Sequence, residues 1–517
     1  MKATRFYSSF LTLSALVLSL ASSNAQAFCG FFAGKADASL FNEASQVILV
    51  RDGNRSVISM LNDFKGPLKD FALVVPVPHV LKEGQVQIGD KRIFDRLDAY
   101  SSPRLAEYFD PDPCPVGQRY DLLEEMEDKS AMPMSRSMGK MKKESDKALG
   151  VAVEASYTVG EYDIVMLSAK QSDGLAIWLR KNGYKMPKGA AAALKPYVAQ
   201  GMKFFVAKVN LKEQAKTGAQ YLRPIQFAFE SEKFMLPIRL GMINADPSKP
   251  QDLIAYVLTK NGRVESANYR TVKLPANENL PPAIKKDFKT FYKTMFDYQA
   301  KQEDHRVVFT EYFWDMGWCD PCAANPLSRT ELNQAGVFWL DNDSNNSNAK
   351  RSRRGGGAQN ALLTRLHVRY TPKTFPEDLM FVQTSDRQNW QTRYVVQNPF
   401  EGTVQQCREI AANYNCEDSC RNIGNGWRDF IKGRGRVASC IQSCRASTNN
   451  AIETARRYYE IDLPQRQKTE MQTLMRYTGW NQSEAERFTG FKPNTSSINS
   501  NNKKWWKTLF NKNKTNQ

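Results

Sequence analysis

Two pairs of cysteines in the C-terminal quarter constrain the fold of this 517-residue chain most strongly. Cys416 and Cys420 are four residues apart, as are Cys440 and Cys444, which places each pair on one face of a helix. If these helices run antiparallel across the glycine-containing segment 424–435, Cys416 meets Cys444 and Cys420 meets Cys440. We therefore predict a helical hairpin held by two disulfides, each contributing about 2–4 kcal/mol. Zinc binding by the four thiols is the alternative, although zinc motifs usually have tighter C-x-x-C spacing.

Residues 1–27 have the form of a cleavable secretory signal. Lys2 and Arg5 precede an apolar run over residues 10–20 that is too short to span a bilayer, and small residues lead to a cleavage site at Ala27. All nine cysteines follow this site, and export would place them where disulfides persist. Because nine is odd, at least one thiol is free or bonded to another molecule.

The composition indicates a basic protein of more than one domain. The chain is longer than one core usually organises. Its net charge of +18 favours contact with anionic lipid or an anionic envelope polymer, or serves solubility alone. Export makes these partners, rather than nucleic acid, the expected ones. No later stretch approaches the about 20 apolar residues of a membrane helix, so we expect no transmembrane helix in the mature chain.

Residues 28–400 have the pattern of a β-rich α+β domain with a mainly antiparallel sheet. Strand-like runs flank the dipeptides at 52–53 and 261–262, which are Asp-Gly and Asn-Gly and typical of hairpin turns. Apolar and polar residues alternate over 151–157, as in a sheet with one wet face. Hairpin-rich order with few helices is typical of the α+β class.

Two helices and two mobile loops are expected to interrupt these strands. One helix covers 172–184 and has its C-cap at Gly183, and the other covers 282–302 with apolar residues at helical spacing. The polar segments 124–147 and 341–360 lack apolar periodicity and are predicted to be mobile loops.

The composition becomes helical in residues 401–490, which we assign to a second, disulfide-stapled helical domain. Ser483 and Glu486 have the capping-box spacing for its last helix. Residues 491–517 are predicted to form a disordered basic and aromatic tail. Its candidate membrane contacts are Lys503, Lys504, Trp505, Trp506, Lys507, Leu509 and Phe510. Such a segment can lie in a membrane interface, and the alternative is a tail that only aids solubility.

Cys319 and Cys322 belong to a Trp-Cys-Asp-Pro-Cys motif that resembles the redox site of the thioredoxin family. The resemblance implies a catalytic dithiol. However, Ser328 and Glu331 have capping-box spacing, so the next helix is predicted to begin there, where its dipole cannot favour a thiolate at Cys319. The negative charge of Asp320 also opposes a thiolate. We favour a structural disulfide role for the pair, with metal binding or unpaired thiols as further alternatives.

Cys29 and Cys114 complete the N-terminal cysteine set. With Cys319 and Cys322 they allow three disulfide pairings, between which the sequence does not choose. Cys407 is then expected to be left over.

Common catalytic and metal-binding signatures are missing from the sequence. The three histidines have no metal-ligand spacing, and His367 is expected to lie in mid-strand as a packed or surface residue. We find no G-x-S-x-G, P-loop or dinucleotide-binding fingerprint. Methionines within 132–141 could capture Cu(I), but a linker is the favoured interpretation. We therefore expect no cofactor and no metal site, and we favour a protein that is not an enzyme.

Several stretches within 28–400 resemble a bacterial family of exported proteins called domain of unknown function 2330. They include ALVVPVP, DAYSSPRLAEYFDPDPC, YTVGEYDIVMLSAKQSDGLAIWL, WDMGWCDPC and LHVRYTPKTFPEDLMF. The resemblance implies an envelope or extracellular location and cysteines placed as Cys29, Cys114, Cys319 and Cys322 are. It brings no known activity.

We therefore predict an exported, periplasmic or extracellular protein, stabilised by disulfides, that acts as a non-enzymatic binding or scaffold module of the cell envelope. One alternative is a thiol-disulfide oxidoreductase with Cys319 as nucleophile and Cys322 as resolving thiol. Another is a peripheral binder of membranes or anionic envelope polymers that uses its basic tail.

Overall fold

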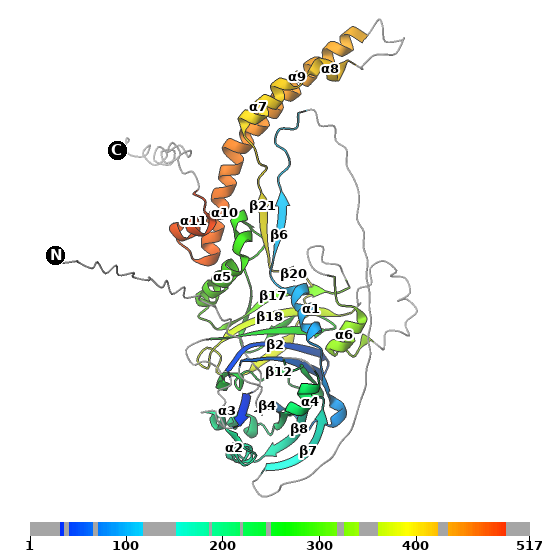
Figure 1. Ribbon diagram of the computed structural model, residues 1–517, viewed down its shortest axis with the longest axis vertical. Coiled ribbons are helices and arrows are strands. Elements are labelled where there is room, and N and C mark those ends of the chain that lie inside the picture. The colour runs from blue at the N-terminus through cyan, green and yellow to red at the C-terminus, as the bar shows by residue number, and fades with distance from the viewer. Residues whose placement is uncertain are drawn as a thin grey trace, which may run out of the picture.

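The computed structural model describes residues 31–35, 41–65, 71–116, 151–185, 189–217, 221–244, 250–317, 325–340, 360–421 and 433–492. Two sheets are stacked face to face, helices cover both outer faces, and a long helical arm extends from this body (Figure 1). The α+β class expected from the sequence is therefore confirmed. The sheets are mixed, because several neighbouring strands are parallel.

The larger sheet has nine strands in the described part of the chain. Their order is β15 (Arg270–Lys273), β17 (Val307–Asp315), β18 (Leu362–Tyr370), β13 (Gln251–Thr259), β2 (Phe41–Asp52), β3 (Arg55–Lys65), β11 (Ile225–Glu230) and β5 (Val86–Ile88), and β20 (Trp390–Gln391) pairs with β17. Strands β2 and β3 form the predicted hairpin at 52–53, where Gly53 has a φ of +55°. The turn requires a positive φ, which glycine adopts without strain.

The hairpin predicted at Asn261-Gly262 is wrong. Strand β13 pairs with β2 and β18, whereas β14 (Val264–Ser266) leaves the sheet and pairs with β19 (Leu379–Gln383). A side chain at Gly262 would lie 2.0 Å from the carbonyl oxygen of Thr384. The glycine therefore allows a close approach of two chain segments rather than a hairpin turn.

The smaller sheet has six strands within the described ranges. Their order is β7 (Val151–Val159), β8 (Tyr162–Ala169), β10 (Lys203–Val209), β4 (Phe71–Val77), β1 (Phe31–Lys35) and β9 (Tyr184–Lys185). Its inner face packs against the larger sheet in one apolar core, to which Leu73, Phe205, Leu253 and Leu366 belong. Its outer face is covered by α2 (Ser172–Lys181) and α3 (Ala190–Ala199). Alternate residues of each central strand thus enter different cores, which explains their nearly continuous apolar runs.

The outer face of the larger sheet packs against α1 (Lys91–Ser101), α5 (Phe288–Gln302) and α6 (Arg329–Ala335). Helix α6 begins at the predicted capping box, since the Ser328 hydroxyl accepts from the Glu331 amide and the Glu331 carboxylate accepts from the Ser328 amide. The helix expected from residue 282 starts as the 3₁₀ turn η3 (Pro282–Asp287). The remaining short elements are η1 (Glu83–Gln85), α4 (Leu211–Lys216), β12 (Met235–Leu236) and η2 (Gly241–Asn244).

A narrow neck connects the body to the arm. Its strands β16 (Asn279–Leu280), β21 (Arg393–Asn398) and β6 (Arg104–Phe109) are parallel. The arm consists of α7 (Val404–Asn413), α8 (Cys416–Cys420) and α9 (Gly433–Arg457), which lie side by side (Figure 1). The chain then returns through the π-helical turn η7 (Tyr458–Asp462), α10 (Leu463–Thr478) and α11 (Gln482–Thr489).

Helices α10 and α11 share an apolar cluster with α5 and β21, through residues such as Phe291, Tyr394 and Leu474. The helical region therefore packs against the body, and our domain boundary near residue 400 stays a prediction. The capping box expected at Ser483 is wrong, because the side chain that caps α11 is Asn481. Within the described ranges, no helix combines the length and apolar character needed to cross a membrane.

Candidate functional site

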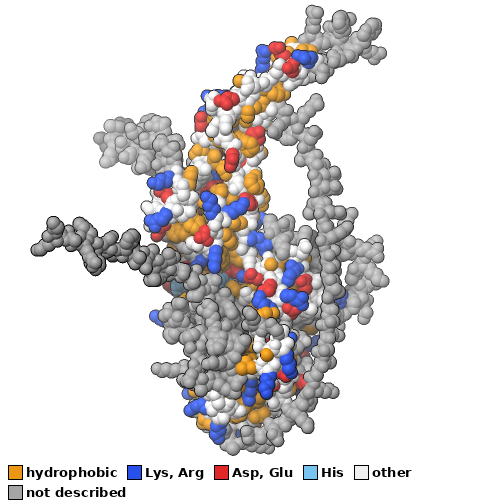
Figure 2. All heavy atoms as spheres, viewed as in Figure 1, with side chains coloured by type: hydrophobic (Ala, Val, Ile, Leu, Met, Phe, Trp, Pro, Cys, Tyr) orange, Lys and Arg blue, Asp and Glu red, His pale blue; other side chains and the backbone are white. Residues whose placement is uncertain are grey.

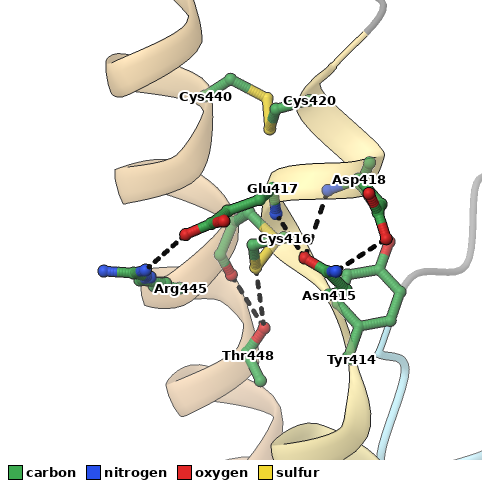
Figure 3. The surroundings of a disulfide bond; sticks show 11 residues. Tyr414, Asn415, Cys416, Glu417, Asp418, Cys420, Cys440, Arg445 and Thr448 are labelled. Carbon is green, nitrogen blue, oxygen red and sulfur yellow. Dashed lines mark hydrogen bonds and ion pairs between the residues drawn. A yellow bond between two sulfur atoms is a disulfide. The ribbon is translucent and has the colours of Figure 1, made fainter.

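Two disulfides join the helices of the arm (Figure 3). Cys416 bonds to Cys444 and Cys420 bonds to Cys440, with Cα–Cα distances of 5.7 and 5.9 Å. This is the pairing that the i, i+4 spacing predicts for antiparallel helices. The two bonds are one helical turn apart, so they fix both the register and the separation of α8 and α9.

Polar contacts surround these disulfides (Figure 3). The Asn415 side chain caps α8 by accepting from the amides of Glu417 and Asp418 at 3.0 and 3.2 Å. Across the helices, Arg445 lies 3.5 Å from Glu417. The Thr448 hydroxyl donates to the Cys444 carbonyl at 2.9 Å. These contacts are mostly exposed and add little to stability, so the disulfides are the main restraint.

The arm has little apolar core in its described part. At its base Cys114, Cys407 and Ala455 form a small buried cluster. Most side chains of α7 and of α9 beyond residue 437 are exposed or half-buried, and Ile410 is 53% exposed. Figure 2 shows apolar, acidic and basic side chains intermingled on the arm and neck. Burial alone therefore does not explain why these helices stay together.

The third disulfide joins Cys114 to Cys407 across 293 residues of sequence. The expectation that Cys407 is left over is wrong, and so is the expectation that Cys114 pairs within the N-terminal set. Strand β6 runs parallel to β21, so the residues that follow both strands arrive together at the base of the arm. No local spacing of residues in the sequence predicts that Cys114 and Cys407 lie close together. Cys29, Cys319 and Cys322 lie outside the described residues.

Asp110 is the polar centre of the neck. Its carboxylate accepts two bonds from Arg466 at 2.9 and 2.8 Å, one from Gln397 at 2.8 Å and one from the Tyr458 hydroxyl. Burial opposes ionisation, but the hydrogen bonds from Arg466 and Tyr458 prevail and lower the pKa of Asp110. Tyr458 also accepts from the Phe400 amide at 2.9 Å. Asp110 thus ties the ends of β6 and β21 to η7 and α10.

Glu470 lies next to this centre and is almost completely buried. Its carboxylate is 3.3 Å from the guanidinium of Arg466. Burial raises the pKa of Glu470 to about 7 despite the attraction of Arg466, and the nearby charge of Asp110 acts in the same direction as burial. The neck therefore contains a carboxyl group that titrates near neutral pH.

A second polar cluster is buried on the outer face of the larger sheet. His367 on β18 places its Nδ1 2.6 Å from Oε1 of Glu311 on β17, and Arg365 donates to the other carboxylate oxygen. Burial opposes ionisation of Glu311, but the charges of His367 and Arg365 lower its pKa to about 2. Burial likewise opposes the charged form of His367, yet Glu311 raises the pKa of the imidazole. His367 is thus a packed residue, one of the two roles expected from the sequence.

Further contacts tie this cluster to the covering helices. Phe296 of α5 stacks on the His367 ring at a centroid distance of 3.9 Å. Arg365 donates to Asp98 of α1 at 2.7 Å, and Arg369 pairs with Asp252 at 2.6 Å. A carboxylate–imidazole pair could transfer a proton, but this pair is enclosed between sheet and helices. Its arrangement serves to hold α1 and α5 on the sheet.

Sequence reasoning missed Glu311, although a signal existed. Polar residues at every second position of β18, namely 365, 367 and 369, lie on one face of a strand that is buried on both faces. Such side chains require buried partners of opposite charge. Which strand supplies them depends on the strand order.

The remaining predicted site residues receive no structural test. The tail residues 503–510 lie outside the described ranges. In the residues that the structure describes, no group of three or more His, Cys, Asp or Glu side chains could hold a metal ion.

The fold and the three disulfides among the described residues define a class of protein, a disulfide-clamped α+β sandwich that carries a helical arm. The chain belongs to the family of uncharacterised proteins conserved in bacteria known as DUF2330, whose model matches residues 23–382. The resemblance found in the sequence is thereby confirmed. The matched range covers most of the body and ends before β21 and the arm.

Two further comparisons add no function. No curated protein matches the chain. Among solved structures, the chain is similar to baculovirus P35, with 11% identity over 44% of this chain and 68% of that one and a TM-score of 0.22.

Proposed function

We propose that this protein is exported and acts as a non-enzymatic binding or scaffold module of the cell envelope, with the arm as the element that contacts a partner. One observation carries the proposal: two disulfides make a helical hairpin rigid although it buries little apolar surface. A rigid element with an exposed surface loses little conformational freedom on binding. The disulfides and the signal-like residues 1–27 support export.

An anionic envelope surface is the partner that the charge favours. Arg408 on α7 is exposed, lies two residues from the exposed Ile410, and has no acidic partner among the described residues. Arg445 on α9 is 68% exposed and makes only a 3.5 Å contact with Glu417. Exposed basic side chains on both α7 and α9 suit anionic lipid head groups or acidic polymers.

Sedimentation of residues 28–517 with phosphatidylglycerol vesicles tests this proposal. Reversing two arm charges in the double variant Arg408→Glu/Arg445→Glu is expected to weaken binding at least about tenfold, since each basic residue contributes about 1 kcal/mol near an anionic surface. The matched control is Lys181→Glu/Lys195→Glu, which changes net charge equally on the exposed sides of α2 and α3. It should change binding less than about threefold.

Two results would contradict the proposal. Equal weakening by both double variants would mean that net charge, not the arm, determines binding. Turnover of insulin disulfides that is abolished by Cys319→Ser would instead establish the oxidoreductase alternative. Deletion of 503–517 in the same assay separates the contribution of the tail from that of the arm.

A further inference from the structure

A cavity of about 260 Å³ opens between the two sheets, where strands β4 and β11 end. Strands β3 and β11 of the larger sheet form one wall, and β4 of the smaller sheet forms the other. Its apolar lining includes Met60, Val75, Met202, Phe227, Met235 and Leu236. The cavity is thus an open extension of the main core, and no residue in the described part of the arm lines it.

The walls are apolar and firmly packed. Met60, Phe227 and Leu236 are at most 2% exposed and belong to the main core. Their positions are therefore fixed by the sheets rather than by a loop. An apolar cavity of this kind gains little from holding water and favours an apolar ligand.

Polar side chains occur at the mouth, where the lining residues become exposed. Lys233 donates to the Gln200 side chain at 2.9 Å and has no carboxylate partner in the described part of the chain. Glu232 beside it is exposed and brings one negative charge to the same rim. Lys233 is the cation that a ligand leaving the cavity would meet.

A second cation stands directly behind this rim. Arg51 is 6% exposed, donates to the Glu232 carbonyl at 3.3 Å and to the Ser56 hydroxyl at 2.8 Å, and lies over the Phe234 ring at 5.3 Å. Its described partners are neutral groups, so its charge is not compensated by a carboxylate. With Lys233 and Arg51 against the single carboxylate of Glu232, the mouth of the cavity has a net positive charge.

We propose that this cavity binds a single-chain amphiphile, with an unbranched alkyl chain between the sheets and an anionic head group at Lys233. This inference is independent of the arm. A methylene group is about the size of a water molecule, which occupies about 30 Å³ in the liquid. The cavity of about 260 Å³ therefore holds a chain of roughly nine methylenes. A medium-chain carboxylate has these properties and serves as the probe.

Calorimetric titration of residues 28–517 with sodium carboxylates of increasing length tests the chain-binding part. Each buried methylene contributes about 0.8 kcal/mol, so affinity should rise about fourfold per carbon and level off at roughly ten carbons. Affinity that does not depend on chain length would overturn the proposal. So would a rise that continues well beyond the length that the cavity holds.

Two kinds of variant locate the ligand. Lys233→Met should weaken decanoate about five- to tenfold and change decanol less than about twofold, whereas the matched control Lys181→Met on α2 should change neither. Met235→Trp and Met202→Trp each fill the cavity from a half-buried position and should weaken decanoate at least about tenfold. Thermal unfolding checks that each variant is folded. Unchanged decanoate binding by a folded cavity-filling variant would exclude this cavity, and equal loss of decanol and decanoate in Lys233→Met would exclude the head-group site.

Discussion

Glu311 shows how single residues hold the body together. Its carboxylate is 1% exposed and accepts from Arg365, His367 and Tyr292, which come from β18 and α5. A buried carboxylate is tolerated only when its partners compensate for the lost hydration. Removing the negative charge leaves Arg365 with Asp98 and His367 with Asp252, at 3.6 Å, as their remaining carboxylates, so two buried cationic groups lose their shared partner.

We expect Glu311→Gln to lower the free energy of unfolding by about 3–5 kcal/mol, because it breaks a buried charge cluster on one side. Urea unfolding at pH 7 measures this effect. The control Asp95→Asn removes an exposed carboxylate that pairs with Lys91 and should change stability by less than about 1 kcal/mol. Equal, small losses in both variants would show that the cluster is not a stabilising unit.

The pH dependence of the same residue has a defined sign. The folded pKa of Glu311 is about 2 and its ordinary value is 4.5, so the unfolded state binds more protons between these pH values. The stabilisation that ionised Glu311 contributes should be complete above about pH 4.5. The free energy of unfolding should then decrease by about 3 kcal/mol as the pH falls to 2. Urea titrations from pH 5 to 2 should show a shallower decrease for Glu311→Gln than for the unmodified chain. Parallel curves would contradict the cause given for the shift.

At the scale of elements, the neck is where distant parts of the chain are joined. Strands β6 and β21 bring Cys114 to Cys407, and Asp110 bonds to η7 and α10 nearby. The arm is thus fixed at its base by one covalent and several polar contacts. Glu470 is the exception, since it is buried beside Asp110 without a full set of partners.

Glu470 should make the neck less stable as pH rises. Its folded pKa of about 7 exceeds the ordinary value of 4.5, so between these values the folded state keeps a proton that the unfolded state releases. Glu470→Gln should match the unmodified chain at pH 4 and exceed its free energy of unfolding by about 1–3 kcal/mol at pH 8. The exposed control Glu460→Gln should show no such divergence. A stability difference of Glu470→Gln that does not change with pH would contradict this interpretation.

The disulfides should differ in their contributions. The Cys114–Cys407 bond closes 293 residues and the Cys420–Cys440 bond closes 20, so loop entropy favours the former by about 2 kcal/mol. Urea unfolding of the two paired Cys→Ser variants under non-reducing conditions tests this order. A larger loss from the Cys420/Cys440 variant would mean that local order in the arm outweighs the entropy of the long loop.

At this scale, local sequence signals predicted local structure. The i, i+4 cysteines, the Asp52-Gly53 turn and the Ser328 capping box each depend on residues close in sequence, and each has the predicted outcome. The hairpin predicted at Asn261-Gly262 does not form, because β13 pairs with β2 and β18 and the strand that follows it, β14, pairs with β19. Strand order is a property of the whole sheet, which a dipeptide does not encode.

The whole molecule combines a body that apolar cores stabilise with an arm that disulfide bonds stabilise. The body has four layers, with helices on the outer face of each of two stacked sheets, and apolar side chains are buried between the layers. The described part of the arm has only a small apolar cluster at its base. The Glu311–His367 pair and the Cys114–Cys407 bond both depend on this three-dimensional arrangement, so neither was predictable from spacing. Reduction should therefore loosen the arm before it affects the sandwich.

Mass spectrometry of non-reduced peptides from the natively folded protein tests the central claim that disulfides hold the arm. We predict peptides linked through Cys114–Cys407, Cys416–Cys444 and Cys420–Cys440. Natively folded protein in which these six cysteines are alkylated as free thiols, or are linked in other pairs, would contradict it.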